Sequence, residues 1–240
     1  MGAPQRQAPL SFGERLAQLV ERVEYRRADT AEDREAIYRL RYAAYLREGA
    51  ITASFGQRLS DRYDDLDNAW LVGLHIDGRL ASSMRIHVAN RDYPDFVASD
   101  VFGEFIKPEI EAGKVIVDPT RFVADAQMAR LYPELPYLTV RVGHMAAEYF
   151  GADLVLATVR AEHQAFYKRV FGHKVVCPPR PYPLLVKPLS LMMLDYRATR
   201  TEIMRRYPFF GSTLEEQREM FGLWPVVATP RESVGAPLAV

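Results

Sequence analysis

The sequence predicts an α/β domain with a mixed central sheet. Strand-like apolar runs alternate with helical repeats in the order β, α, β-hairpin, β, α, β, α, β, β. Apolar residues make up 48% of the 240 residues, which is enough to bury one full core. Lys and Arg number 31, as do Asp and Glu, so no net charge draws the chain to nucleic acid or to an anionic membrane.

The predicted sheet begins with a short strand that is followed by a helix. Val23 and Tyr25 alternate with charged residues, as in a strand that buries one face. Thr30 stands three residues before Asp33, which predicts a helix N-terminus with a capping box at this point. Apolar residues at helical spacing follow, and we expect this helix to end near Gly49.

A hairpin and a longer strand come next. Two apolar runs in "AWLVGLHIDGRLASSMRIHV" meet at Asp77-Gly78, a dipeptide that strongly favours a two-residue hairpin turn. Residues 89–113 are rich in Asp, Pro and Gly, so we expect no regular structure there. The run "KVIVDPTRFVAD", residues 114–125, then predicts a buried strand.

The second half of the sheet alternates helices and strands. Pro136 opens a helix that runs to Tyr149. "DLVLATV" predicts a buried strand and "EHQAFYKRVFG" a short helix that ends at Gly172. "HKVVC" and "LSLMMLDY" predict the last two strands. Two C-terminal helices follow, and the second is expected to begin at Ser212 with Glu215 as a capping box.

These elements divide the chain into four parts. Residues 22–196 are expected to form the domain, and residues 1–21 an N-terminal extension. Residues 197–222 are the C-terminal helices, which we expect to pack on the domain. Residues 223–240 are expected to be a flexible tail, because they hold several Gly and Pro residues and few apolar anchors.

Cysteine and histidine usage speaks against a metal centre. Cys177 is the only cysteine, so a disulfide framework is impossible, and we expect a reducing, cytoplasmic compartment. The histidines have no metal-ligand spacing, so no bound metal is expected. No apolar run approaches the roughly 18 residues of a transmembrane helix, and we expect no integral membrane span.

The predicted strand over residues 114–125 is interrupted by Asp118, Pro119 and Arg121. A buried charge is costly unless it is paired, so charges in this run suggest a function. In a regular strand Asp118 and Arg121 would face opposite sides of the sheet. A bulge at Pro119 would turn both charges to one side. It would also separate this strand from "DLVLATV" and open a cleft.

This order of elements, with separated central strands, resembles the GNAT acyltransferase fold, in which the arm of an acyl thioester lies between two diverging strands. "HQAFYKRVFGHKV" is similar to the Tyr-x-x-x-Gly-Phe region of that superfamily. The glycine-containing loop that holds the pyrophosphate of coenzyme A is missing, because "VADAQMARLYPELP" has no glycine. The resemblance therefore implies a donor such as acyl carrier protein ahead of acyl-coenzyme A, with no bound cofactor.

Four blocks carry a narrower resemblance. "YDDLDNAWLV", "SSMRIHV", "SDVFGEF" and "VDPTRF" follow one another as similar blocks do in acyl-homoserine-lactone synthases and long-chain N-acyl amino acid synthases. Asp118 and Thr120 stand where these families usually have Glu and Ser. "RLRYAAYLREGAITASFG" does not show the Phe and Trp pattern expected beside an S-adenosylmethionine pocket. The resemblance implies an N-acyltransferase that moves a medium or long acyl chain to the amine of an amino acid or similar small acceptor.

The resemblance also implies roles for particular charged residues. Asp64, Arg85, Asp118 and Arg121 match functional positions of the family. Arg85 and Arg121 are able to pair with Asp64, Asp67 or Asp118, in a charged lattice that fixes a zwitterionic acceptor. A lattice with a purely structural role is the alternative.

The donor site is predicted less sharply. Tyr167 lies where related acyltransferases place a tyrosine that protonates the leaving thiolate, although it also fits an apolar helix stripe. The helix opened at Pro136 offers its N-terminus to the phosphate of phosphopantetheine. The expected donor-binding residues, each of which fits a core position or a solvated face as well, are Phe122, Leu138, Arg141, Val142 and Lys168.

Two other functions fit the same residues. The first is an acyl-homoserine-lactone synthase that uses S-adenosylmethionine and releases methylthioadenosine. The second is a non-catalytic GNAT-like module that binds a carrier protein or a lipid. Acceptor identity, acyl chain length and oligomeric state do not follow from the sequence.

Overall fold

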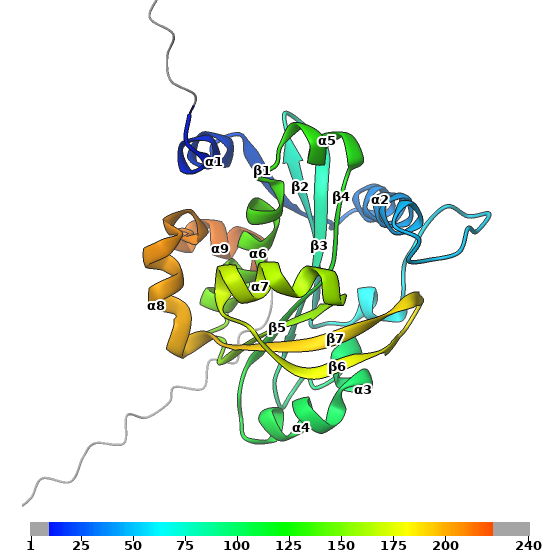
Figure 1. The fold of residues 1–240 in the computed structure, drawn as a ribbon, viewed down its shortest axis with the longest axis vertical. Coiled ribbons are helices and arrows are strands. Elements are labelled where there is room, and N and C mark those ends of the chain that lie inside the picture. The colour runs from blue at the N-terminus through cyan, green and yellow to red at the C-terminus, as the bar shows by residue number, and fades with distance from the viewer. Residues whose placement is uncertain (1–9, 223–240) are drawn as a thin grey trace, which may run out of the picture.

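The computed structural model describes residues 10–222. A seven-stranded mixed sheet, with strand order β1-β2-β3-β4-β5-β7-β6, lies at its centre and has helices on both faces (Figure 1). The predicted α/β fold class is therefore confirmed. The tail expected over residues 223–240 lies outside the described residues, as do residues 1–9 of the expected N-terminal extension.

The elements follow the predicted order, with additional short helices. The strands are β1 (Val23–Arg27), β2 (Ala69–Ile76), β3 (Arg79–Ala89), β4 (Ile116–Ala124), β5 (Leu154–Val159), β6 (Lys174–Tyr182) and β7 (Leu185–Asp195). The α-helices are α1 (Phe12–Val20), α2 (Ala31–Arg47), α3 (Val97–Val101), α4 (Gly103–Glu111), α5 (Ala126–Leu131), α6 (Leu135–Tyr149), α7 (Gln164–Phe171), α8 (Tyr196–Arg206) and α9 (Leu214–Phe221). Three 3₁₀ turns are η1 (Arg62–Asp65), η2 (Ala161–His163) and η3 (Pro208–Phe210).

Local signals in the sequence explain where several elements begin and end. Thr30 accepts a hydrogen bond from the backbone N–H of Asp33 and so caps α2. Asp77 and Gly78 form the β2–β3 turn with φ values of 51° and 77°, which a type I′ turn requires. Gly172 ends α7 in the left-handed region with φ 83°. The predicted helix start at Thr30, the hairpin turn and the helix end at Gly172 are confirmed. Thr30 and Asp33 form only half of the predicted capping box, because the Asp33 carboxylate accepts from the Thr30 hydroxyl and not from its backbone N–H.

Four helices differ from the expectation. Helices α3 and α4 occupy residues 89–113, where irregular structure was expected, because burial of Ile106 and Ile110 outweighs the helix-breaking Pro108. Helix α1 lies in the expected N-terminal extension. Helix α5 follows β4 directly.

Capping signals for two of these helices are present in the sequence. Ser11 and Glu14 form a capping box at the start of α1, and Asp125 caps α5. The capping box of α9 consists of Thr213 and Glu216, one residue later than the predicted pair. Ser212 and Thr213 are adjacent, as are Glu215 and Glu216, so the sequence fits a capping box at either pair equally well.

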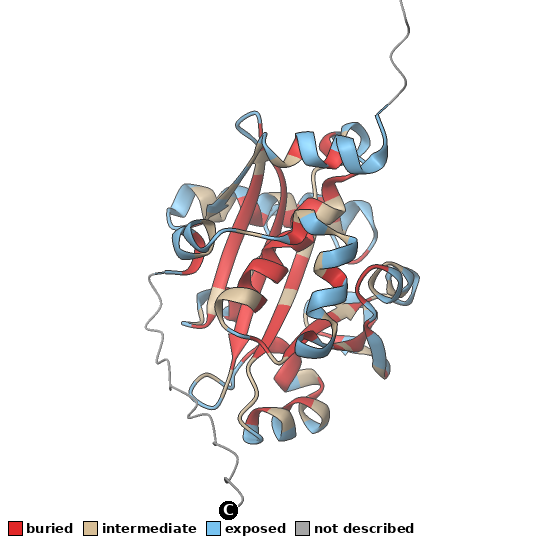
Figure 2. Cartoon of the chain, turned by 90° about the vertical axis from the view of Figure 1, so that its left-hand side faces the viewer, coloured by how far each residue is buried: buried red, intermediate tan, exposed pale blue. Residues whose placement is uncertain are grey.

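The two faces of the sheet carry different helices. Leu71 of β2 packs against Ile37 and Tyr38 of α2 on one face. Trp70 and Val72, the neighbours of Leu71, point to the other face and join the main core with residues of α6, α7 and α9. Figure 2 shows that the central strands are buried along most of their length.

Helix α6 approaches β4 closely because Gly143 has no side chain. A Cβ atom at Gly143 would lie 2.9 Å from Cγ of Pro119, inside the distance that side chains tolerate. The contact lies beside the point where β4 leaves β5. The space at Gly143 therefore helps to set the position of α6 against the interrupted strand.

We expect Gly143→Ala to lower the free energy of unfolding by about 1–3 kcal/mol, because the new methyl group overpacks the contact with Pro119. Urea denaturation measures this change. Gly13→Ala is the matched control, since Gly13 is exposed in α1 and a Cβ there meets nothing within 4 Å. The control should be neutral or stabilising. Equal stability of the two variants would contradict the tight contact.

Candidate active site

The site begins where the two central parallel strands separate. β4 and β5 pair only at Ile116 with Leu154 and at Val117 with Val155. Both strands then continue without pairing to each other, β4 to Ala124 and β5 to Val159. The predicted separation of these strands is confirmed, and it leaves one edge of β4 open.

The bulge in β4 lies two residues beyond the expected position. Pro119 stays in register opposite Ile86 of β3. Thr120 pairs with Arg85 and Val123 with Ser83, so β4 contains one extra residue between these pairs. Arg121 occupies this extra position with φ 54°, a left-handed conformation that is unfavourable for a long side chain. The prediction of a bulge at Pro119 is therefore wrong in position.

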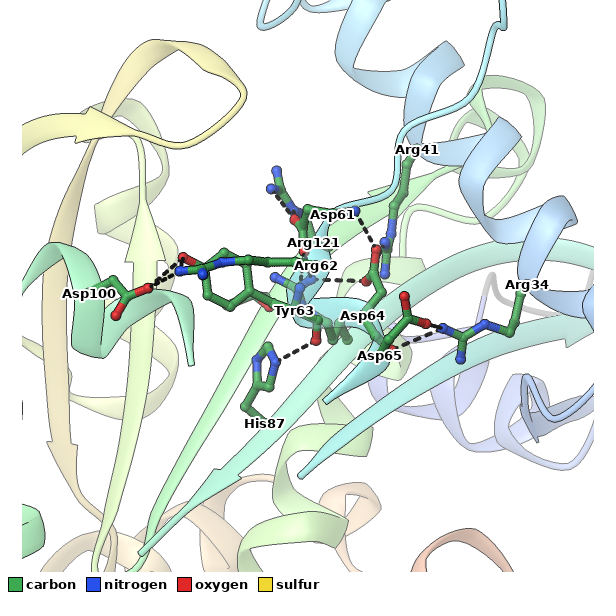
Figure 3. Close-up of polar contacts among 12 residues, drawn as sticks. Arg34, Arg41, Asp61, Arg62, Tyr63, Asp64, Asp65, His87, Asp100 and Arg121 are labelled. Atoms are coloured by element: carbon green, nitrogen blue, oxygen red, sulfur yellow. Dashed lines mark hydrogen bonds and ion pairs between the residues drawn. The ribbon is translucent and has the colours of Figure 1, made fainter. Parts of the chain in front are cut away.

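Although the bulge lies at Arg121 and not at Pro119, it still brings charged side chains of β3 and β4 to one side of the sheet. Arg85 and Arg121 share Asp61, with nitrogen to oxygen distances of 2.5 and 2.6 Å. Arg85 and Arg41 share Asp64, at 2.9 and 2.8 Å (Figure 3). These three arginines and two aspartates, which we call the charged lattice, link α2, η1, β3 and β4.

The lattice depends on the turn η1. Asp61 caps η1 by accepting the backbone N–H of Tyr63, and the Asp64 side chain accepts the backbone N–H of Asp61 at 2.9 Å. Burial alone would raise the pKa of Asp61, but Arg85 and Arg121 outweigh it and hold the pKa at about 2. Burial alone would also raise the pKa of Asp64, but Arg41 and Arg85 outweigh it and lower the pKa. Both carboxylates are therefore ionised at neutral pH.

Sequence reasoning found part of the lattice. Asp64, Arg85 and Arg121 belong to it, whereas Asp67 is exposed and lies outside it. Asp61 and Arg41 were missed. Asp61 lies just before the Asp-rich block, at the N-terminal capping position of η1. An aspartate at that position is the sequence signal that could have identified it. Arg41 carried no such signal, because its burial follows from how α2 packs on the sheet.

Asp118 is buried without a pairing partner. It lies opposite His87 in the β3–β4 register, and neither carboxylate oxygen has a hydrogen-bond partner within residues 10–222. Burial raises the pKa of Asp118 to about 7, although Arg85 opposes this change. The carboxyl group therefore changes charge near neutral pH, as a group that takes up a proton during turnover must.

A cavity of about 440 Å³ passes through the opening between β4 and β5. Its wall includes residues of α2 on one face of the sheet and of α7 on the other. Representative lining residues are Tyr45, Arg121, Phe122, Thr158, Phe166 and Tyr167. The cavity is therefore lined from both faces of the sheet, and its walls are mostly apolar with a few polar groups.

Tyr167 stands at the boundary between two cavities. It lines the large cavity and also a small one of about 20 Å³, whose wall includes Pro119, Gly143 and His173. Burial, with smaller contributions from Tyr45 and Asp118, raises the pKa of Tyr167 well above its usual value. Its hydroxyl therefore stays protonated at neutral pH and is able to donate a proton or a hydrogen bond.

Expected donor-binding residues are distributed over three environments. Phe122 lines the large cavity. Leu138 and Val142 are fully buried in the core around α6 and do not line it. Arg141 is buried as well, because it donates to the backbone oxygen of Gly211 and so ties α6 to the C-terminal segment. Lys168 is exposed and donates to the side chain of Gln164.

The start of α6 lies at the cavity, as expected, but it already carries a negative charge. Pro136 lines the cavity wall. Glu134, the N-terminal capping position of α6, is buried and pairs with Arg15 of α1 at 2.6 Å. A phosphate group at this helix end would therefore share the positive end of the dipole with Glu134.

Neither a metal centre nor a transmembrane helix is found within residues 10–222. No group of three or more His, Cys, Asp or Glu side chains in this range is arranged to hold a metal ion. No helix in the same range has both the length and the apolar character needed to cross a bilayer.

Comparisons with known proteins identify relatives. The family model of the N-acyl amino acid synthase FeeM matches residues 36–195. The structure of FeeM, an N-acyl amino acid synthase from uncultured soil microbes, is similar with a TM-score of 0.61 and 17% identity, covering 77% of this chain and 96% of that one. No curated protein sequence matches this chain significantly.

Acyl-homoserine lactone synthases share the fold as well. LasI is similar with a TM-score of 0.56 and 14% identity, covering 75% of this chain and 94% of its own. BjaI, a CoA-dependent synthase, has a TM-score of 0.53 and 15% identity, covering 78% of this chain and 89% of its own. The resemblance to the GNAT acyltransferase fold is therefore confirmed.

Asp118 makes stability depend on pH in a testable way. Its folded pKa of about 7 lies above the ordinary value of 3.8, so its contribution is present below pH 4 and is lost as the pH rises through 7. Relative to Asp118→Asn, the wild type should lose up to about 1.4 kcal/mol per pH unit between pH 5 and 7. Urea unfolding at pH 5, 6 and 7 measures this difference.

Other buried groups do not disturb the comparison. Burial lowers the pKa values of His87, His144 and His173 to about 3. These histidines therefore make the free energy of unfolding rise with pH, opposite to the effect of Asp118. They are present in both proteins, so their effect cancels in the difference. A difference that does not change with pH would mean that Asp118 keeps an ordinary pKa in the fold.

Proposed function

Because this chain belongs to the family of the N-acyl amino acid synthase FeeM and is therefore an acyltransferase, we propose that it transfers a medium or long acyl chain from acyl carrier protein to the amine of an amino acid or similar small acceptor. The observation that carries the proposal is the cavity through the opening between β4 and β5, which adjoins the charged lattice. A donor is able to enter from one face of the sheet and an acceptor from the other.

The open edge of β4 supports the place proposed for the donor. Beyond Val117 the strand makes no pairing with β5, so β5 does not occupy the backbone groups on that side, and they are proposed to bond the amides of a phosphopantetheine arm. Backbone N–H groups there are also proposed to stabilise the oxyanion of a tetrahedral intermediate. Phe122 and Phe166 offer apolar contacts to the acyl chain.

Asp118 and Arg121 are the proposed acceptor residues. An amino acid arrives as an ammonium ion and must lose a proton before its nitrogen attacks the thioester carbon. A carboxylate with a pKa of about 7 suits this task near neutral pH. Arg121 lines the cavity and has an unbonded N–H group, which suits the acceptor carboxylate. Asp64 and Arg85 are proposed to hold Arg121 and Asp61 in place.

Tyr167 is the proposed acid. The C–N bond forms as the C–S bond breaks, and the leaving thiolate needs a proton. The raised pKa of Tyr167 keeps its proton in place until a strong base forms beside it. The second proton of the attacking ammonium then restores the tyrosine, so the reaction releases one proton in all.

The carrier-protein donor is supported by what lies after β4. Residues 123–136 contain no glycine, and helix α5 with its cap Asp125 takes the place of an open anion-binding loop. The ion pair of Glu134 with Arg15 already occupies the N-terminal end of α6. Both features suit a donor that brings one phosphate better than one that brings a nucleotide pyrophosphate. A cytoplasmic site of action is part of this proposal, and the single buried Cys177 supports it.

The proposal is tested by product analysis. The protein is incubated with acyl carrier proteins of several chain lengths, a mixture of amino acids and S-adenosylmethionine, with acyl-coenzyme A as a parallel donor, and products are identified by mass spectrometry. We expect an N-acyl amino acid with the carrier donor. An acyl lactone together with methylthioadenosine would replace the proposal with a lactone synthase, and absence of product with every donor would refute it.

We expect Arg121→Ala to reduce kcat/KM by about 100-fold or more, since it removes a buried cation that lines the cavity. Unfolding should stay cooperative, because Asp61 keeps its pairing with Arg85. Arg205→Ala is the control, as Arg205 is exposed and pairs with Glu202 in the same helix. Activity in Arg121→Ala comparable to the control would exclude Arg121 from the site.

Tyr167→Phe should lower kcat by about 10- to 100-fold and leave the KM of the acceptor nearly unchanged, because it removes a proton donor and keeps the ring. Steady-state kinetics at saturating donor measure both quantities. A donor with a less basic thiol leaving group should reduce the defect. An unchanged kcat would assign Tyr167 to packing alone.

A further inference from the structure

Unpaired polar atoms gather on the α2 face of the sheet, around Asp118. Both Asp118 oxygens, one terminal nitrogen each of Arg85 and Arg121, and the Tyr182 hydroxyl are buried and have no hydrogen-bond partner in the described part of the chain. Native proteins bond nearly all such groups, because an unmade bond destabilises the fold. A cluster of them points to a site where the missing partner is a ligand.

Tyr182 is held in this place by an unusually stiff strand. It is the last residue of β6, where Pro178, Pro179, Pro181 and Pro183 restrict the backbone around it. Its side chain is only 5% exposed. The strand therefore directs one tyrosine inward with little conformational freedom.

The hydroxyl of Tyr182 lies among the groups of the proposed acceptor site. It interacts electrostatically with Asp118, Arg121 and Arg85, and its contact with the side chain of Thr158, which lines the cavity, is weak and does not reach the geometry of a full hydrogen bond. Burial raises the pKa of Tyr182 well above its ordinary value. The hydroxyl is therefore a neutral donor near neutral pH.

We propose that Tyr182 is an acceptor-binding residue whose hydroxyl donates a hydrogen bond to the carboxylate of the amino acid. The inference rests on the proposed function. Free N–H groups of Arg85 and Arg121 donate to the same carboxylate, and Asp118 accepts from the ammonium group. Among the unpaired groups, Arg85, Arg121 and Tyr182 offer three donors and Asp118 offers a carboxylate acceptor, which matches the two ends of an α-amino acid.

The charges of the lattice agree with an anionic group at this place. Three guanidinium groups, of Arg41, Arg85 and Arg121, face two carboxylates, of Asp61 and Asp64. One buried positive charge is uncompensated unless Asp118 ionises. An acceptor carboxylate supplies the balancing charge and leaves Asp118 free to take up a proton.

The test variant is Tyr182→Phe, which removes one oxygen atom and keeps the ring. We expect the KM of the amino acid to rise about tenfold or more, since a hydrogen bond to a charged group is lost, with kcat within about twofold. A second measurement needs no turnover. The urea midpoint of the ligand-free variant should rise, because an unbonded buried hydroxyl is removed.

Tyr196→Phe is the matched control. Tyr196 is 2% exposed, and its hydroxyl donates to Glu148 at 2.7 Å, far from the charged lattice in the α6–α9 core. Its loss should lower the urea midpoint and leave the KM of the amino acid unchanged. The two variants therefore shift stability in opposite directions and only one of them shifts KM.

Separate outcomes identify which idea fails. An unchanged KM in Tyr182→Phe, with the wild type active, would overturn the role of Tyr182 and leave the proposed function standing. A lowered urea midpoint in Tyr182→Phe would also overturn it, because the hydroxyl would then have a partner within the protein. Absence of any N-acyl amino acid from the wild type would overturn the proposed function and the acceptor role together.

Discussion

The structure depends on one constraint, the early end of pairing between β4 and β5. Two strands in the middle of a sheet normally satisfy each other's backbone groups along their whole length. Here they do so only at Ile116–Leu154 and Val117–Val155 and then separate. The separation forms a cavity through a sheet that would otherwise be closed, and it brings Arg121 and Tyr167 to the wall of one space.

The extra residue in β4 determines which side chains meet at this opening. Without it, Arg121 would point toward the α6 face, into the apolar core. With it, Arg121 takes a left-handed conformation and reaches Asp61. The local strain is offset by two charge-assisted hydrogen bonds to one carboxylate, at 2.6 and 3.2 Å.

The charged lattice fixes the relative positions of the elements that it links more than it stabilises the fold. Removal of five charged groups from water carries a large penalty, which pairing repays only in part. What the lattice does supply is a fixed relation between α2, η1, β3 and β4. Within residues 10–222, unpaired nitrogen atoms remain on its three arginines, and the neighbouring Asp118 has two unpaired oxygen atoms. Stability is thus given up at the proposed active site.

The sequence alone determined the fold class, the order of the main elements, the turn at Asp77-Gly78 and the separation of the central strands, because these follow from periodicity and from the backbone preferences of Gly and Pro. It also singled out Asp64, Arg85, Asp118 and Arg121. Only the tertiary structure decided their partners. Asp61 meets Arg121 across 60 positions of the chain, Arg41 is buried by the packing of α2, and Tyr182 arrives from β6. Such contacts depend on how distant elements pack, and no local pattern encodes them.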